Sequence, residues 1–281
     1  MHFKAKFFKI LFIFPFFRKR YFGFYKKIFK PRKLFQGQST VCRFDSSLKI
    51  KVDLDEWIQQ HIYFFGSWDE RGTNFLKLNL NPGDVFFDVG ANIGCFSLIA
   101  SKIVGPEGKV HSFEPVTRVY ERLLANIQLN GLKNISANRK AVFESSGTLE
   151  LFVSSNENVG MSSIFHHDTE SGQVEIAESI SLDEYVQKEG ISEIKMIKVD
   201  IEGAEIFALR GMKQILKKLK PVFIIELSED VLKNTRMEGN EVLEFMQSMR
   251  YEIRKIYKCG HTGPVSETKS EYTNYAFFPI D

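Results

Sequence analysis

Five carboxylates stand where apolar strands end in this sequence, and their placement is the strongest chemical signal in the chain. They are Asp88, Glu114, Glu144, Asp200 and Glu226. A carboxylate accepts hydrogen bonds from hydroxyl groups, and a well-placed one can also remove the proton of an alcohol. The set therefore predicts a site that binds a hydroxyl-bearing ligand and carries out acid–base chemistry.

The stretch VFFDVGANIGCFS, residues 85–97, places Gly90 and Gly94 between an apolar strand and a helix. A dinucleotide site requires G-x-G-x-x-G with a pyrophosphate at the helix N-terminus, and the middle glycine is missing here. A carboxylate at Asp88 would also disfavour a pyrophosphate. No G-K-[ST] follows, which excludes a P-loop. The pattern favours a ligand with a cationic end, which would approach the backbone at Gly90 and face Asp88.

S-adenosylmethionine, a nucleoside with a cationic amino-acid tail, meets these demands. Glu114 ends the next strand, 24 residues after Gly90, where an acid commonly accepts hydrogen bonds from both ribose hydroxyls. Asn92 could bind the methionine carboxylate, cap the following helix, or do both. The predicted cofactor-binding residues are Asp88, Gly90, Asn92, Gly94, Glu114 and Glu144.

The stretch KVDIEGAE, residues 198–205, brings three further acids to the end of the fourth strand. Methyl transfer to an alcohol needs alignment of the oxygen and removal of its proton. We predict catalytic roles for Asp200, Glu202, Glu205 and Glu226. The alternative is that these acids only stabilise a helix N-terminus through its dipole. Mg²⁺ held by Asp200, Glu202 and Glu226 is a further possibility, although the spacing does not require a metal.

Alternating strands and helices must position these residues. The predicted strands are residues 84–89, 109–115, 135–143, 194–200 and 221–228, with an additional strand at 147–155 and two final ones at 251–257 and 272–278. The predicted helices are residues 93–103, 116–130, 181–190, 205–219 and 240–250, and a long polar loop covers 156–173. Such alternation indicates a parallel α/β sheet with ligands bound at the carboxyl ends of its strands.

The charge is divided unevenly along the 281 residues, although the net charge is only +3. Residues 1–44 hold twelve Lys or Arg and no acid, which leaves 26 basic and 35 acidic residues in the remainder. We therefore divide the chain into a basic, Phe-rich arm (1–35), a lead-in of strand and helices (36–80) and a methyltransferase domain (81–281).

The arm contains eleven basic residues and eleven phenylalanines. Its longest apolar run, residues 10–17, is interrupted by Pro15 and is too short to span a bilayer, which takes about 20 residues. The composition favours contact with an anionic membrane surface. Packing of the phenylalanines onto the globular domain and binding of single-stranded nucleic acid are the alternatives. Three scattered cysteines indicate a reducing compartment, so we expect a cytoplasmic protein, peripheral at the membrane.

Four blocks together resemble the FkbM-type family of S-adenosylmethionine-dependent methyltransferases. They are IYFFGSWDE, DVGANIG, FEP and IKVDIEGAE, and the likeness covers residues 50–230. DVGANIG marks any methyltransferase of this fold, whereas IKVDIEGAE is specific to the family. The resemblance implies a Rossmann-like, seven-stranded class I sheet with helices on both faces. It also implies O-methylation of a sugar, a glycan or a small molecule. The basic arm is no part of the family pattern.

Three other functions fit less well. An RNA methyltransferase is compatible with the basic arm, but the acidic remainder of the chain disfavours a nucleic-acid partner. A non-catalytic nucleotide-binding module tethered to a membrane would have no need of Asp200 and Glu202. An NAD-dependent oxidoreductase is disfavoured by the missing glycine. The Asn/Asp-Pro-Pro-aromatic block common in methyltransferases that act on amines is absent after the fourth strand, which favours an oxygen acceptor.

Overall fold

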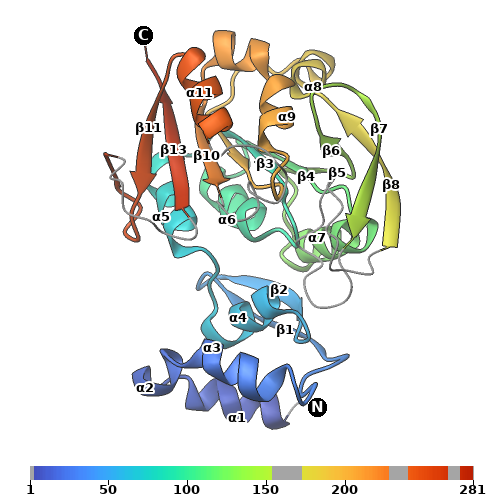
Figure 1. Cartoon of the computed structure of the whole chain (residues 1–281), viewed down its shortest axis with the longest axis vertical. Coiled ribbons are helices and arrows are strands. Elements are labelled where there is room, and N and C mark those ends of the chain that lie inside the picture. The colour runs from blue at the N-terminus through green and yellow to red at the C-terminus, as the bar shows by residue number, and fades with distance from the viewer. Residues whose placement is uncertain (1–2, 154–172, 228–239, 265–272, 281) are drawn as a thin grey trace.

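The computed structural model describes residues 3–153, 173–227, 240–264 and 273–280 (Figure 1). The polar loop predicted at 156–173 lies outside these residues, apart from Gln173. Eight strands form the main sheet in the order β12-β11-β13-β10-β9-β3-β4-β5. Their bounds are β3 Val85–Val89, β4 Lys109–Phe113, β5 Ile135–Asn138, β9 Met196–Val199, β10 Val222–Leu227, β11 Tyr251–Ile256, β12 Thr262–Gly263 and β13 Thr273–Pro279.

Neighbouring strands run parallel from β5 to β10, whereas β13 is antiparallel to both β10 and β11. The chain adds β4 and β5 on one side of β3 and then returns to add β9 on the other. Strand order thus reverses between β3 and β9, which is where ligands bind in open α/β sheets. This is the predicted Rossmann-like seven-stranded sheet with one short extra strand, β12. The prediction of fold class is confirmed.

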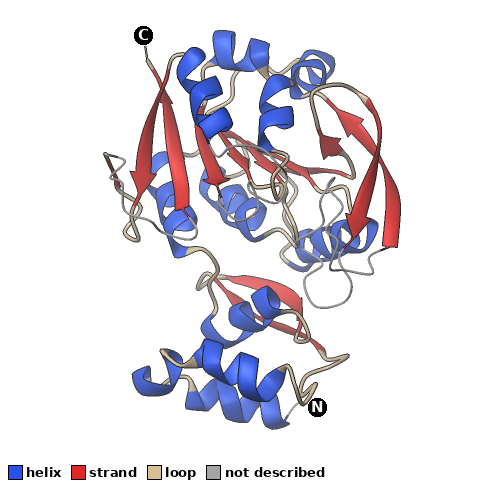
Figure 2. Cartoon of the chain, viewed as in Figure 1, coloured by secondary structure: helices blue, strands red, loops and turns tan. Residues whose placement is uncertain are grey.

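Helices cover both faces of the sheet, which explains why β3 and β9 are almost entirely buried and, apart from Asp88 and Lys198, apolar (Figure 2). The helices are α5 Glu70–Asn79, α6 Cys95–Val104, α7 Thr117–Leu129, α8 Leu182–Glu189, α9 Glu205–Arg210, the π-helix η3 Ile215–Leu219 and α11 Asn240–Ser248. Ser181 caps α8 as its sequence suggests, accepting a hydrogen bond from Glu184 N. The helix predicted over 205–219 is interrupted at Gly211, the C-cap of α9. Glycine is required at this point because a Cβ would lie 2.2 Å from the carbonyl oxygen of Phe143.

The strand predicted over 135–143 is wrong in extent. β5 ends at Asn138, whose side-chain amide donates to the carbonyls of Ser112 and Ser136. After two residues the chain begins β6 (Ala141–Val142), which belongs to a separate three-stranded sheet with β7 (Gly147–Val153) and β8 (Gln173–Ile180). Residues beyond 138 therefore leave the carboxyl edge of the main sheet.

The N-terminal unit comprises residues 3–65 and lies at one end of the molecule (Figure 1). Its elements are α1 Phe3–Leu11, α2 Pro15–Arg18, α3 Tyr21–Phe24, the π-helix η1 Tyr25–Phe29, β1 Ser39–Phe44, β2 Leu48–Asp53 and α4 Trp57–Phe65. Phe12, Tyr21, Phe29 and Phe35 are each at most 5% exposed. All four rings contact Phe64 of α4. Burial of one such ring contributes about 1.5–3 kcal/mol, so this part of the arm is core.

Helix α7 attaches the N-terminal unit to the main sheet. Asn126 Oδ1 accepts from Lys51 N at 2.7 Å, and Asn130 pairs with both backbone groups of Lys49 at 2.8 and 2.7 Å. Arg122 completes the attachment with two hydrogen bonds to the carboxylate of Asp53, at 2.8 and 2.6 Å. No helix among the described residues is both long and apolar enough to cross a membrane.

Candidate active site

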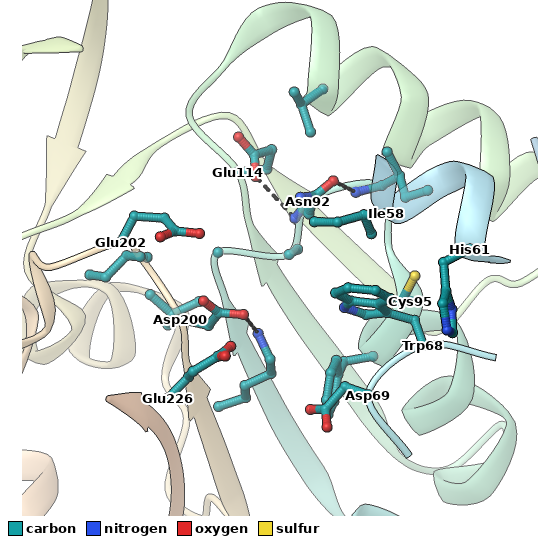
Figure 3. Close-up of a pocket in the computed structure, with 18 of the residues that line it drawn as sticks. Ile58, His61, Trp68, Asp69, Asn92, Cys95, Glu114, Asp200, Glu202 and Glu226 are labelled. Atoms are coloured by element: carbon teal, nitrogen blue, oxygen red, sulfur yellow. Dashed lines mark hydrogen bonds and ion pairs between the residues drawn. The ribbon is translucent and has the colours of Figure 1, made fainter. Parts of the chain in front are cut away.

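A cavity of about 1130 Å³ opens at the carboxyl ends of the parallel strands (Figure 3). Its lining comes from the glycine loop after β3, the ends of β9 and β10, and the turn between α4 and α5. Further lining residues come from the N-terminal unit, including Arg18 and Lys19. The cavity therefore lies between the N-terminal unit and the main sheet.

Lys198 is the buried cation at the centre of the acidic wall. Its Nζ lies 2.9 Å from Asp200 Oδ2 and 4.0 Å from Asp88 Oδ1. Burial lowers the pKa of Lys198, but the carboxylates of Asp200 and Asp88 outweigh that effect and raise it. The ammonium group therefore stays charged and offsets part of the repulsion among the surrounding acids.

Glu202 and Glu226 stand beside Asp200 on the same side of the cavity (Figure 3). Burial, followed by the charge of Asp200, raises the pKa of Glu202 to about 8. The charge of Asp200, followed by burial, raises the pKa of Glu226 to about 9. A carboxyl group whose pKa lies near the working pH is suited to general acid–base catalysis, and of the predicted catalytic set this argument applies to Glu202 and Glu226.

Asp69 is a cavity carboxylate that the sequence reasoning missed. It caps α5 by accepting from Gly72 N at 3.1 Å, and Asn274 Nδ2 donates to its second oxygen at 2.9 Å. Burial raises its pKa. A capping residue before a helical stretch was a local signal for Asp69, but only the fold shows that this cap faces the same cavity as Asp200.

Glu114 and Asn92 form the opposite part of the site. Glu114 is 7% exposed, and its two carboxylate oxygens accept from Asn92 N and Val116 N, each at 3.0 Å. Burial raises its pKa to about 7. The Asn92 side chain accepts from Ile93 N at 2.7 Å within the glycine loop, before α6 begins at Cys95, so it does not cap that helix. Both residues line the cavity.

Both glycines have a packing role that the sequence did not predict. Gly90 has φ +79°, and a Cβ there would lie 1.9 Å from the carbonyl oxygen of Asp200, so the close neighbour is the loop after β9. A Cβ at Gly94 would lie 2.7 Å from Leu123, so this glycine allows α7 to pack closely. Only Gly90 lines the cavity.

Asp88, Glu144 and Glu205 are not among the cavity-lining residues. Asp88 is completely buried behind the site, where Ser97 Oγ donates to it at 2.5 Å. Glu205 Oε1 accepts from Ile201 N and Gly203 N, so its carboxylate shapes the loop that carries Glu202. Glu144 is exposed because the chain leaves the main sheet after β5. The geometry therefore places none of the three against a bound ligand.

The magnesium expectation finds no support. Among the described residues, no three His, Cys, Asp or Glu side chains come together in an arrangement that could hold a metal ion. Of the cavity acids, Asp200 instead pairs with the ammonium group of Lys198, which also lies 4.0 Å from the buried Asp88.

A sheet of this strand order, with an acid-rich cavity at its carboxyl edge, defines a class I methyltransferase. Residues 88–253 match the family described as Methyltransferase FkbM domain. The match covers more than half of the chain, which therefore belongs to the FkbM methyltransferase family.

Two characterised relatives have acceptors stated in their names. The hexuronic acid methyltransferase AglP of Haloferax volcanii is 30% identical over 141 residues, which cover 50% of this chain and 55% of that protein. The 31-O-demethyl-FK506 methyltransferase FkbM of Streptomyces tacrolimicus is 27% identical over 162 residues, covering 48% of this chain and 62% of that protein. The matched part of this chain thus spans little more than half the length of these relatives.

Two solved structures illustrate the likeness in fold. Methyltransferase FkbM from Methylobacillus flagellatus is similar with a TM-score of 0.46 and 16% identity, over 71% of this chain and 44% of that one. A methyltransferase from Streptococcus mutans in complex with SAH is similar with a TM-score of 0.45 and 12% identity, over 75% of this chain and 97% of that one.

Proposed function

We propose that this protein transfers a methyl group from S-adenosylmethionine to a hydroxyl oxygen of a sugar or another small molecule. One observation carries the proposal: the partly buried acids Asp200, Glu202 and Glu226 share a single cavity with the buried Glu114, at the switch point of the sheet. One part of the cavity suits a nucleoside, and the other suits a hydroxyl group that must lose its proton.

The residues around Glu114 fit S-adenosylmethionine. An ionised carboxylate has about four acceptor positions, and backbone N–H groups occupy two of those on Glu114. The remaining positions are available to the two ribose hydroxyls. Val116 and Val142 line the cavity nearby and offer apolar surface for a purine. When bound, S-adenosylmethionine would supply a methyl carbon activated by its sulfonium.

Glu202 is our candidate for the base that removes the acceptor proton. It lines the cavity, and its raised pKa gives it the basicity that an ordinary carboxylate lacks. Asp200 is less suitable as a base because the ammonium group of Lys198 lies 2.9 Å away. We assign Asp200 and Glu226 the orientation of the acceptor hydroxyls.

The relatives support an oxygen acceptor, since one is named for a hexuronic acid and another for 31-O-demethyl-FK506. The Asn/Asp-Pro-Pro-aromatic block of methyltransferases that act on amines is absent after β9, which also favours an oxygen acceptor. We therefore place sugar hydroxyls first among the acceptors to be tested.

The test of the donor site is calorimetric titration with S-adenosylhomocysteine. We expect Glu114→Gln to weaken binding about tenfold or more, because it removes the charge from hydrogen bonds worth about 1.5–3 kcal/mol each. Glu144→Gln is the matched control, since Glu144 is an exposed acid after the neighbouring strand and does not line the cavity. Equal affinity for Glu114→Gln and wild type would contradict the proposed donor site. Mass spectrometry of sugars incubated with labelled donor would locate the methyl group on oxygen or elsewhere.

We also propose that the N-terminal unit contacts an anionic membrane surface. Residues Phe3, Phe7, Ile10, Ile13, Phe14 and Phe16 are 55–82% exposed, in a segment that carries many lysines and arginines and no acid. Exposed apolar rings among cations suit the boundary between headgroups and acyl chains.

A further inference from the structure

The cavity does not end at the acids of β9 and β10 but continues to the N-terminal unit. Trp57 and His61 of α4 line it, as do Trp68 of the following turn and Arg18 of α2. None of these residues has a role in the donor site or in proton removal as proposed above. The role that we assign to them, in binding the acceptor, rests on the proposed function.

The two tryptophans form an aromatic wall on this side of the cavity. The ring centroids of Trp57 and Trp68 are 5.5 Å apart with an interplanar angle of 88°, and His61 lies 5.4 Å from Trp68. Figure 3 shows Trp68 and His61 across the cavity from Asp200 and Glu226. Trp57 Nε1 is buried and has no hydrogen-bond partner among the described residues. The wall thus offers apolar ring surface, which suits the C–H face of a sugar.

Two cations at this end of the cavity, Arg18 and Lys19, form no salt bridge within the described ranges. The guanidinium of Arg18 lies 4.9 Å from the ring centroid of Phe65, which neighbours His61 at 4.6 Å. Lys258 and Lys198, which line the same cavity, instead form salt bridges with Glu70 and Asp200. The arm itself contains no acid, and Glu70, the cavity carboxylate whose pKa the charge of Arg18 helps to lower, is already paired with Lys258.

We propose that Arg18 and Lys19 bind an anionic group on the acceptor while its sugar ring packs against Trp57 and Trp68. The anionic group is a carboxylate or a phosphate, because a guanidinium binds either through paired hydrogen bonds. The acceptor would span the cavity, with its acid at the N-terminal unit and its reactive hydroxyl at Glu202. The N-terminal unit is thereby part of the acceptor site.

The experiment compares three acceptors: methyl glucuronide as the carboxylate, glucose 6-phosphate as the phosphate and methyl glucoside as the neutral reference. Binding to the full chain is measured by calorimetry with S-adenosylhomocysteine present, and KM and kcat are measured where turnover occurs. The test variants are Arg18→Gln and Lys19→Gln. Arg20→Gln is the matched control, since Arg20 is an exposed cation two residues away that stacks on Phe16 and does not line the cavity.

We expect wild type to prefer one of the acidic acceptors over methyl glucoside. Arg18→Gln should weaken that acceptor roughly tenfold, with affinity for methyl glucoside and for S-adenosylhomocysteine unchanged. The acidic acceptor that loses affinity in Arg18→Gln shows whether the site binds a carboxylate or a phosphate. Three results would each overturn the proposal. They are an equal loss of affinity for acidic and neutral acceptors, an equal loss of affinity in Arg20→Gln, and unchanged affinity in Arg18→Gln. Arg18-dependent binding without methyl transfer would support the anion site and contradict the proposed function. Methylation of sugars without any preference for the acidic acceptors would support the proposed function and contradict the anion site.

Discussion

Glu202 occupies an unusual backbone position for a glutamate, with φ +53° in the loop that follows β9. The loop keeps this conformation because Glu205 accepts hydrogen bonds from Ile201 N and Gly203 N on either side. We therefore propose that Glu205 acts as a positioning residue and that Glu202 is the carboxyl group presented to the acceptor. A single loop thus separates the two roles that the sequence had assigned together.

The pH dependence of turnover tests the role of Glu202. A general base acts in its deprotonated form, which predominates above its pKa. Because the pKa of Glu202 is raised to about 8, kcat/KM should rise with pH and level off above that value. Glu202→Gln should lower kcat/KM by roughly a hundredfold and abolish the rise, since general-base catalysis contributes on that scale. Affinity for S-adenosylhomocysteine should stay within twofold of wild type, by calorimetry.

The control is Glu193→Gln, an exposed acid just before β9 that does not line the cavity. It should show the wild-type pH profile. A Glu202→Gln variant that retains the rise near pH 8 would exclude Glu202 as the base and direct attention to Glu226.

The strand-end acids were predictable because the periodicity of strands and helices determines which edge of the sheet each residue reaches. Asp200, Glu226 and Glu114 follow from that rule alone. Asp69 and Arg18 do not follow from it. Asp69 is held in part by Asn274, 205 residues further along the chain, and the position of Arg18 depends on how the N-terminal unit docks on α7. Glu144 was misplaced for a local reason, namely that two residues after Asn138 carry the chain into a different sheet.

At the scale of elements, the loops after β3 and β9 support each other. Because Gly90 has no side chain, the carbonyl oxygen of Asp200 can lie only 1.9 Å from the position that a Cβ of residue 90 would occupy. The glycine loop after β3 and the loop after β9 consequently pack directly against each other. The sequence pattern pointed to a close neighbour of Gly90, but a ligand and a second loop leave the same signature in a sequence.

Gly90→Ala should therefore damage both parts of the site. Gly131→Ala is the matched control: Gly131 also has positive φ, at +62°, but a Cβ added there would meet no atom within 4 Å. Left-handed backbone costs alanine about 1–2 kcal/mol, so both variants should lose that much stability in urea titrations. Only Gly90→Ala should lose substantially more, together with S-adenosylhomocysteine binding and turnover. Equal losses in the two variants would show that the contact with Asp200 is unimportant.

At the scale of the whole molecule, the N-terminal helix α1 is apolar on two faces. Phe8 and the buried Ala5 pack inward, whereas Phe3, Phe7 and Ile10 are 82%, 55% and 62% exposed. Deleting the arm would remove core rings as well as exposed ones, so it would confuse unfolding with loss of membrane contact. Substitution of the exposed face avoids that difficulty.

Sedimentation with vesicles tests the membrane proposal. The full chain should pellet with anionic vesicles and be partly released by high salt, because surface charges are screened. Changing Phe3, Phe7 and Ile10 together to serine should abolish most of the pelleting while the melting temperature stays unchanged. The control is Val174→Ser with Ile176→Ser, which removes apolar residues 54% and 61% exposed on β8, away from the basic segment. Retained pelleting of the triple variant would contradict contact through this face.

The attachment of β2 to α7 has a practical consequence. The hydrogen bonds that Asn126 and Asn130 form with Lys51 and Lys49 involve the backbone of these lysines and not their side chains. Both lysine side chains are exposed. Cysteine can therefore replace Lys51 without loss of the amide contact. Of the three native thiols, Cys259 is exposed and the other two are buried. A dye pair on positions 51 and 259 would report the separation of the two halves of the cavity during binding, by energy transfer in solution.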